Sequence, residues 1–241
     1  MELNIPFMIE TFRLALSGIP TTLALTVVPL LCAFPIGLLM ALVRIYRLPG
    51  LRQLVTVMVS FVRGTPIVLQ ILIVYSLLPS LFNSFVRKAG WDFNVFDINP
   101  ILYAFVVFTI NTSAAVSEVL RSALLTVDRG QLEAAHSVGI SSFNAYRRII
   151  LPQALVVALP SLCNVAINLM KSTSLAFMMT VKDVTALAKI NAAYGYNYIE
   201  AYLDILIIYV VLCGMAQVLF SLVEKHVGRY RLADAMGRQR A

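Results

Sequence analysis

The chain has 241 residues, of which 60% are hydrophobic and 13% are charged, whereas soluble domains average about 45–50% apolar and about 25% charged. This composition excludes an ordinary soluble globular domain and indicates a chain whose main solvent is lipid. The net charge of +7 does not indicate nucleic-acid binding, because excess Lys and Arg in a membrane protein more often report its orientation.

Five apolar runs follow one another along the chain, and each is long enough to cross a bilayer, which takes roughly 20 mostly apolar residues. We expect spans at residues 19–43, 54–78, 100–125, 154–179 and 202–222. Ahead of them, residues 7–17 are amphipathic and form either a separate interfacial helix or an extension of the first span. The sequence therefore predicts an all-α membrane protein with about five transmembrane helices, folded as one domain over residues 1–241.

Basic residues gather in alternate connecting segments, and this pattern predicts how the chain is oriented. They lie between the first and second spans, between the third and fourth, and after the fifth: Arg44, Arg47, Arg52, Arg129, Arg147, Arg148, Lys225, Arg229, Arg231, Arg238 and Arg240. Segments rich in Lys and Arg stay in the cytoplasm. We therefore expect the amino terminus outside and the carboxyl terminus in the cytoplasm. A cleaved signal peptide is not expected, since the first ten residues carry acids and no base.

The connection between the third and fourth spans, residues 128–152, is expected to be a cytoplasmic loop that begins with a short helix. That helix covers residues 131–137. Gly139 follows it, at the place where a left-handed helix cap favours glycine. On its surface, Ala134 and Ala135 leave little side-chain bulk, so that another surface can approach closely, and Glu133 adds an acidic contact.

A second short helix is expected at residues 143–150 of the same loop. Either Ser141 or Ser142 can cap its start. Leu151-Pro152 is then expected to break the chain, and Pro152 suits the first turn of the fourth span.

The order of residues in this loop resembles the EAA loop of ABC importer permeases, with Glu133-Ala134-Ala135, then Gly139, then Ile150-Leu151-Pro152. A loop that merely connects two spans does not require so many fixed positions. In that family the loop carries the coupling helix, which docks into a groove on a cytoplasmic ATPase subunit. The resemblance therefore implies that ATPase coupling rests on Gln131, Glu133, Ala134, Ala135, Gly139 and Pro152.

Further stretches are similar to the polar amino-acid uptake branch of this family, which includes histidine, glutamine and cystine permeases. They are residues 19–23, 61–66, 117–121, 130–135, 151–154 and 171–175. Two stretches depart from the usual pattern of the branch. Residues 113–118 read Ser-Ala-Ala-Val-Ser-Glu where the family has an Ala-Tyr and an Ala-Glu, and Ser172 stands where Asp often follows Lys171. Either departure can alter substrate preference.

The resemblance also implies an assembly in the bacterial cell membrane, in which this multi-pass chain is one part. The other parts are a second permease subunit, identical or different, two cytoplasmic ATPase subunits and an extracytoplasmic solute-binding protein. ATP and Mg would be bound by the ATPase, and no cofactor by this chain, since it has no phosphate-binding Gly-x-x-x-x-Gly-Lys-Ser/Thr loop. The substrate would be a polar amino acid, with cystine as a first guess.

Ionisable residues inside apolar spans are costly, so each is a functional candidate by default. Arg63 lies near the middle of the second span, where Gly64, Thr65 and Pro66 interrupt helix regularity. Arg63 either meets the substrate carboxylate, with Thr65 beside it, or pairs with backbone carbonyls at a kink.

The third span carries Asn111, Glu118 and Arg121, and the last two lie on one helical face because they are three residues apart. Glu118 and Arg121 form a local ion pair at the entry to the loop, or else Glu118 faces the pathway and attracts a substrate ammonium group. Asn111 is a further pathway candidate.

The fourth span carries a polar stripe, because its polar residues recur at spacings of four and three. The stripe comprises Asn164, Asn168 and Lys171 and continues through Thr173 and Ser174. In lipid it must face another helix or water. It is therefore a wall of the pathway or a seam between subunits, and these alternatives stay open.

Three other functions are weighed against an amino-acid importer. An ABC importer for another small solute would share the coupling loop. An ion-coupled secondary transporter usually shows internal repeats, and none is clear here. A membrane enzyme would need a catalytic or metal constellation, and His136 and His226 lack metal-ligand spacing.

Overall fold

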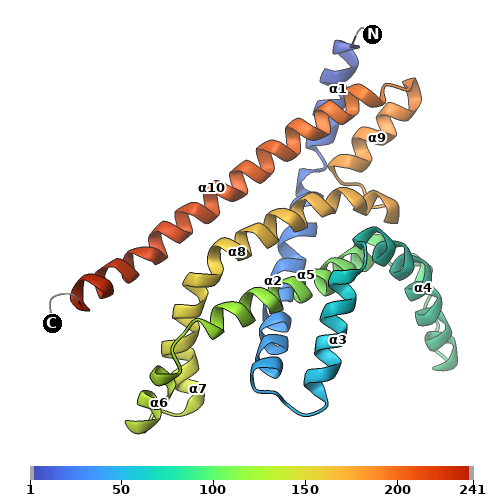
Figure 1. Ribbon diagram of the computed structural model, residues 1–241. Helices are drawn as coiled ribbons and strands as arrows, with labels where there is room; N and C mark the ends of the chain where they lie inside the picture. The colour runs from blue at the N-terminus through green and yellow to red at the C-terminus, as the bar shows by residue number, and fades with distance from the viewer. Residues whose placement is uncertain (1–2, 239–241) are drawn as a thin grey trace.

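The computed structural model describes residues 3–238, and every regular element in that range is a helix (Figure 1). Within it, five helical segments are long and apolar enough to cross a membrane: Ile5–Ile45, Ile67–Lys88, Pro100–Leu125, Ser142–Met179 and Tyr198–His226. This confirms the predicted all-α architecture with five candidate spans. Arg240, one of the residues behind the predicted orientation, lies outside the described part of the chain.

The first segment consists of two consecutive helices, α1 (Ile5–Leu16) and α2 (Ile19–Ile45), and α2 continues downward from α1 in Figure 1. They meet at Gly18, where a β-carbon would lie only 2.5 Å from the backbone nitrogen of Val184. Glycine is therefore needed for the close approach of the start of α9 (Val184–Gly195). The amphipathic stretch predicted at residues 7–17 thus lies largely in α1, a helix of its own that also lengthens the first span.

The second apolar run is divided into α3 (Leu51–Gly64) and α4 (Ile67–Lys88), with Thr65 and Pro66 in extended conformation between them. Proline lacks the N–H that a helix needs and pushes the preceding residue out of the helical region. The expected interruption is confirmed, but the continuous span predicted at residues 54–78 is wrong. Only α4, which begins after the break, is long enough to be a spanning candidate.

Helix α5 (Pro100–Leu125) has the predicted bounds of the third span and packs closely against α2. Its start is marked by Asn99, whose side-chain oxygen accepts a hydrogen bond of 3.0 Å from Ile101 N, and by the proline that follows. At Gly37 of α2, a β-carbon would lie 2.7 Å from Val116 Cγ1 of α5. A short 3-10 helix, Val95–Asp97, precedes α5.

The loop after α5 begins with α6 (Arg129–Ser137), which ends as the sequence predicts. Gly139 has a φ of 78° and donates to His136 O at 2.9 Å, while Ile140 N donates to Ala135 O at 3.0 Å. These two bonds form a Schellman cap. Ser141 occupies the N-cap position of the next helix, although its side chain makes no capping hydrogen bond.

The predicted break at Leu151-Pro152 is wrong, because α7 (Ser142–Ala145) continues through a π-helical turn, Tyr146–Ile150, into α8 (Leu151–Ser172). Leu151 N bonds to Tyr146 O, five residues back, so the widened turn precedes the proline instead of ending the helix. A 3-10 helix, Thr173–Met179, then closes the fourth span.

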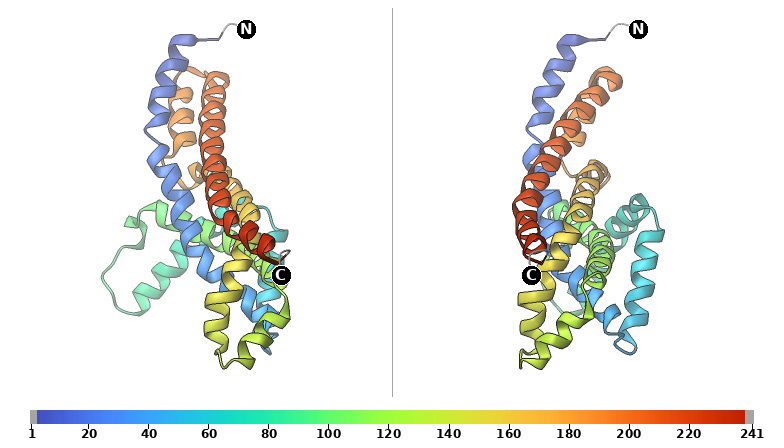
Figure 2. Two further views of the ribbon diagram at one scale, coloured as in Figure 1. Left: turned by 90° about the vertical axis from the view of Figure 1, so that its left-hand side faces the viewer. Right: turned by 60° about the vertical axis from the view of Figure 1, so that its left-hand side comes forward.

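The chain ends with α9 (Val184–Gly195) and the long helix α10 (Tyr198–Arg238), which pack with α1 at one end of the molecule (Figure 2). Small residues let these three helices approach closely: Ala15, Ala188, Ala192 and Ala201 are fully buried there. The other end of the molecule, with α6 and α7, lies far from this cluster in both views.

Candidate pathway and coupling sites

Glu118 of α5 lies at the centre of three arginines that come from three helices. Arg44 Nη1 of α2 lies 2.7 Å from Glu118 Oε1, and Arg121 Nη2 lies 3.1 Å from Oε2. Arg63 Nη1 of α3 is more distant, at 3.7 Å from Oε1. One carboxylate therefore faces three guanidinium groups. The predicted ion pair of Glu118 with Arg121 is present, and Glu118 also contacts arginines of two other helices, while its attraction of a substrate ammonium group stays a prediction.

Arg63 is the least engaged member of this cluster. Its side chain is 55% exposed, against 14% for Arg44. The structure places Arg63 beside the break between α3 and α4, where its guanidinium extends from the last turn of α3. Most of its hydrogen-bonding capacity is thus left for a ligand or for water.

Gln70 of α4 satisfies the backbone that the break exposes. Its Nε2 donates to Val62 O at 2.8 Å and to Thr65 Oγ1 at 2.9 Å, and its Oε1 accepts from Asn111 Nδ2 at 3.0 Å. Two predicted pathway residues, Thr65 and Asn111, are therefore held by Gln70, a residue that the sequence did not single out. The hydrogen bonds of Gln70 therefore hold the break between α3 and α4 in place and connect it to α5.

The predicted stripe on α8 is divided by the structure. Asn164, Asn168 and Lys171 are exposed on the surface of this single chain. Thr173 is instead fully buried, and Ser174 is half-buried with its hydroxyl bonded to Lys171 O at 2.8 Å. Three of the five candidates thus form an exposed polar face, while the side chain of Thr173 lies in the interior of the protein.

Thr173 belongs to a buried polar network centred on Asp183, which the sequence did not reveal. Asp183 Oδ1 accepts from Ala186 N at 2.8 Å and caps α9, and Oδ2 accepts from Tyr209 OH at 3.2 Å. Tyr209 OH in turn lies 3.2 Å from Thr173 Oγ1. Burial raises the pKa of Asp183 above its ordinary value of 3.8, outweighing the hydrogen bonds that lower it.

Replacing Asp183 by alanine is expected to lower stability by about 2 kcal/mol, because α9 loses its cap and Tyr209 loses its acceptor. Asp183→Asn should cost less. A raised pKa means that the folded chain holds this proton more tightly, so stability falls as pH rises from 3.8 through the folded-state value. Thermal unfolding of the detergent-purified chain between about pH 4 and 7 should show a flatter profile for Asp183→Asn. Profiles of equal slope would contradict this account.

The predicted coupling residues on α6, in the connection between the third and fourth spans, face either the surface or the interior. Glu133 and Ala134 are exposed, whereas Ala135 is 4% exposed and packs inward. The exposed face is small and acidic. Gly139 fixes the end of the helix through its left-handed conformation, which other residues rarely adopt.

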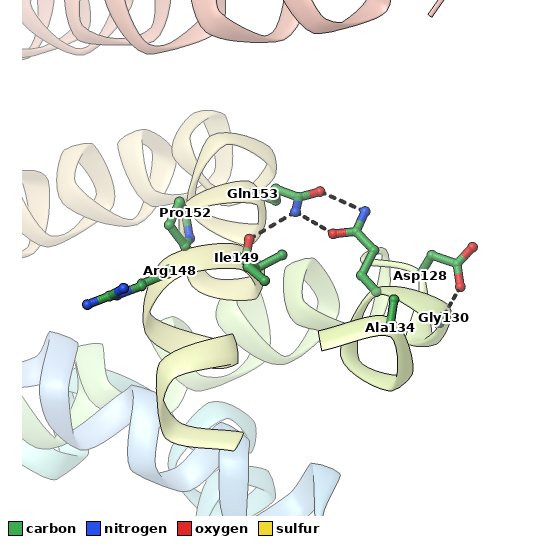
Figure 3. Close-up of a pocket in the computed structure, with 8 residues that line it drawn as sticks. Asp128, Gly130, Ala134, Arg148, Ile149, Pro152 and Gln153 are labelled. Atoms are coloured by element: carbon green, nitrogen blue, oxygen red, sulfur yellow. Dashed lines mark hydrogen bonds between the residues drawn. The ribbon is translucent and has the colours of Figure 1, made fainter. Parts of the chain in front are cut away.

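A cavity of about 560 Å³ lies between α6 and the start of α8 and is lined in part by Gln131, Pro152 and Gln153 (Figure 3). Across it, the side chains of Gln131 and Gln153 are joined by two hydrogen bonds. The predicted coupling residue Gln131 is therefore half-buried and points toward the fourth span.

Besides Asp183 and Tyr209, three further residues of these sites have contacts that the sequence did not reveal: Arg44, Gln70 and Gln153. Arg44 was counted only as a charge that sets orientation. For Gln70 the sequence does contain a signal, because its amide lies inside an otherwise apolar run shortly after a proline and must find a partner there. Gln153 appeared only within a stretch that carries the family resemblance.

Comparisons with known proteins agree over most of the chain. A family model described as a binding-protein-dependent transport system inner membrane component matches residues 33–229. The L-cystine transport system permease protein TcyL of Bacillus subtilis (strain 168) is 37% identical over 209 residues, covering 87% of this chain and 85% of that protein. The probable amino-acid permease protein YxeN of the same strain is 36% identical over 223 residues, covering 92% and 95%.

The fold is also similar to a solved structure, the crystal structure of an amino acid ABC transporter with histidines. The two align with a TM-score of 0.76 and 29% sequence identity, and the alignment covers 94% of this chain and 100% of that one. The similarity thus extends over nearly all of this chain.

Proposed function

The chain belongs to the family of binding-protein-dependent transport system inner membrane components, and from this membership we propose how its helices serve transport. It is the multi-pass inner-membrane permease of an amino-acid ABC importer, a subunit without catalytic activity of its own. A transporter of this family works with an ATPase and a binding protein. Residues 1–241 act as a single permease domain in this proposal.

The amino terminus lies outside and the carboxyl terminus in the cytoplasm. Arginines at the end of α2 and in the connection to α3 support this orientation, as do Arg147 and Arg148 beside α6. The end of the molecule built from α1 and α9 then faces the binding protein. The end with α6 faces the ATPase.

Helix α6 acts as the coupling helix, and one observation carries this proposal. Its Glu133–Ala134 face is exposed and small, while the same helix is capped and anchored to the fourth span on its other side. Two ATPase subunits bind ATP and Mg, and each pushes on one such helix. Nucleotide then biases the permease between inward-open and outward-open states.

The pathway is completed by a second permease subunit, identical or different. Asn164, Asn168 and Lys171 form an exposed polar face that lipid cannot satisfy. Such a face requires another helix or water. A pathway formed between two subunits supplies both.

The substrate is a polar amino acid, received from an extracytoplasmic binding protein. Arg63 is the group that meets its carboxylate, because this guanidinium is exposed and only distantly paired with Glu118. A guanidinium binds a carboxylate through two parallel hydrogen bonds. Cystine is the first candidate, since one relative at 37% identity is named as an L-cystine permease.

Arg63→Lys is expected to raise the KM for uptake roughly tenfold, because lysine keeps the charge but loses the planar fork. Assembly with the ATPase should be unchanged, since the side chain of Arg63 is 55% exposed. Uptake kinetics in proteoliposomes measure the first effect and co-purification the second. An unchanged KM would remove Arg63 from the substrate site.

The proposed function is tested by uptake into proteoliposomes that contain the permease, its ATPase and its binding protein. Uptake of labelled cystine should require ATP and should persist after ion gradients are dissipated. Unlabelled cystine, histidine and glutamine should be compared as competitors. Uptake driven by an ion gradient without the ATPase would favour a secondary transporter, and binding-protein affinity only for other solutes would favour a different importer.

A further inference from the structure

Two glutamines that lie 22 residues apart in the chain form a reciprocal pair between α6 and the first turn of α8. Gln153 Nε2 donates to Gln131 Oε1 at 2.6 Å, and Gln131 Nε2 donates to Gln153 Oε1 at 3.2 Å. Figure 3 shows Gln153 reaching across the cavity toward α6. We call this contact the amide pair. Both side chains are half-buried, so each is partly shielded from water.

Gln153 makes a third bond at the point where the helical backbone is irregular. Its Nε2 also donates to Ile149 O at 2.9 Å, within the π-helical turn Tyr146–Ile150. Pro152 follows that turn and has no N–H to donate to a carbonyl of the preceding turn. The side chain of Gln153 therefore ties together α6, the π-helical turn and α8.

Helix α6 has few other attachments to the body of the protein. Among the side chains of α6 that the structure describes, residues 130–137, only Ala135 is buried, and Leu132 is partly buried against the cluster around Ala154 and Leu124. A displacement of α6 can therefore reach the spans through only a few contacts. A second polar contact, 3.1 Å between His136 Nε2 and Ser142 Oγ, reaches only α7 at the start of this segment, whereas the amide pair joins α6 to α8 itself.

We propose that the amide pair transmits movement of α6 into α8, so that Gln131 and Gln153 are positioning residues for the coupling of ATP hydrolysis to transport. This inference rests on the proposed role of α6 as the coupling helix. Glu133 and Ala134 face outward to the ATPase, while Gln131 faces inward and passes the displacement to the span that carries the exposed polar stripe.

The test uses the complete transporter in proteoliposomes and measures transport, ATP hydrolysis and ATPase co-purification. Gln153→Leu and Gln131→Leu keep side-chain bulk but remove the amide pair. Each should still co-purify with the ATPase and hydrolyse ATP, while substrate transported per ATP falls roughly tenfold. Gln53→Leu makes the same change at an exposed glutamine of α3, so it is the matched control and should transport normally.

A rescue separates a missing contact from a general defect. Gln153→Glu alone loses both donated bonds and should be uncoupled. Combining it with Gln131→Lys replaces the amide pair by an ion pair and should restore most of the transport per ATP. Normal coupling in the leucine variants, or no recovery in the double variant, would overturn the inference. Loss of ATPase binding in Gln153→Leu would overturn it too, whereas normal ATPase binding in Glu133→Lys would instead overturn the proposed docking role of α6.

Discussion

Replacing Glu118 by leucine is expected to destabilise the folded permease by about 3 kcal/mol and to abolish uptake. The change removes the single carboxylate between Arg44, Arg63 and Arg121, which then face one another without compensation. Arg44 is the most affected, because its side chain is only 14% exposed and loses a partner at 2.7 Å. Because both side chains are largely shielded from water, leaving Arg44 uncompensated is more costly than the pair is stabilising.

Thermal unfolding in detergent and uptake in proteoliposomes measure the two effects of this substitution. Arg63→Gln is the matched control for stability, since its contact to Glu118 is long, at 3.7 Å, and largely exposed. It should unfold at nearly the temperature of the unmodified protein. Equal unfolding temperatures for Glu118→Leu and the unmodified protein would show that the arginine cluster does not depend on this carboxylate.

Features with a local cause could be predicted from the sequence. Helix α5 has the predicted bounds because Asn99-Pro100 supplies a start signal and the apolar run has no interruption. The cap of α6 was predicted because only glycine readily adopts the conformation that Gly139 requires. The interruption at Pro66 was expected for the same kind of reason, since proline constrains its own backbone and that of its neighbour.

Features that depend on tertiary contacts were missed. Arg44 and Glu118 are 74 residues apart, and no pattern within either helix says that they meet. The bonds of Gln70 at the helix break follow from the packing of α4 against α5. Pro152 was expected to break the chain because proline interrupts regular helix, but the π-helical turn before it absorbs the missing hydrogen bond.

The proposed coupling loop contains both kinds of feature within a few residues. Sequence pattern predicted which residues belong to it, and the structure shows that they face two ways, with Glu133 exposed and Gln131 turned inward. A motif contains positions that face different surfaces, and their roles differ accordingly. Substitutions at the two positions should therefore produce different defects, one in ATPase binding and the other in coupling.

Glu133→Lys is expected to weaken ATPase binding by more than tenfold and to abolish uptake, while leaving the fold of the permease intact. Glu133 is exposed on α6, and its carboxylate bonds to none of the side chains that the structure describes, since the bond from Ser137 Oγ goes to the backbone carbonyl of Glu133. Reversing the charge of an interface residue places like charges together, which costs several kcal/mol when the interface is complementary.

Co-purification of the ATPase and ATP-dependent uptake measure this effect, and thermal unfolding of the permease alone checks the fold. Glu224→Lys is the matched control, because Glu224 is also an exposed acid but lies on α10, away from α6. Glu224→Lys should assemble and transport normally. If Glu133→Lys also did so, α6 would not be the docking element, and the movement that drives transport would have to enter the spans elsewhere.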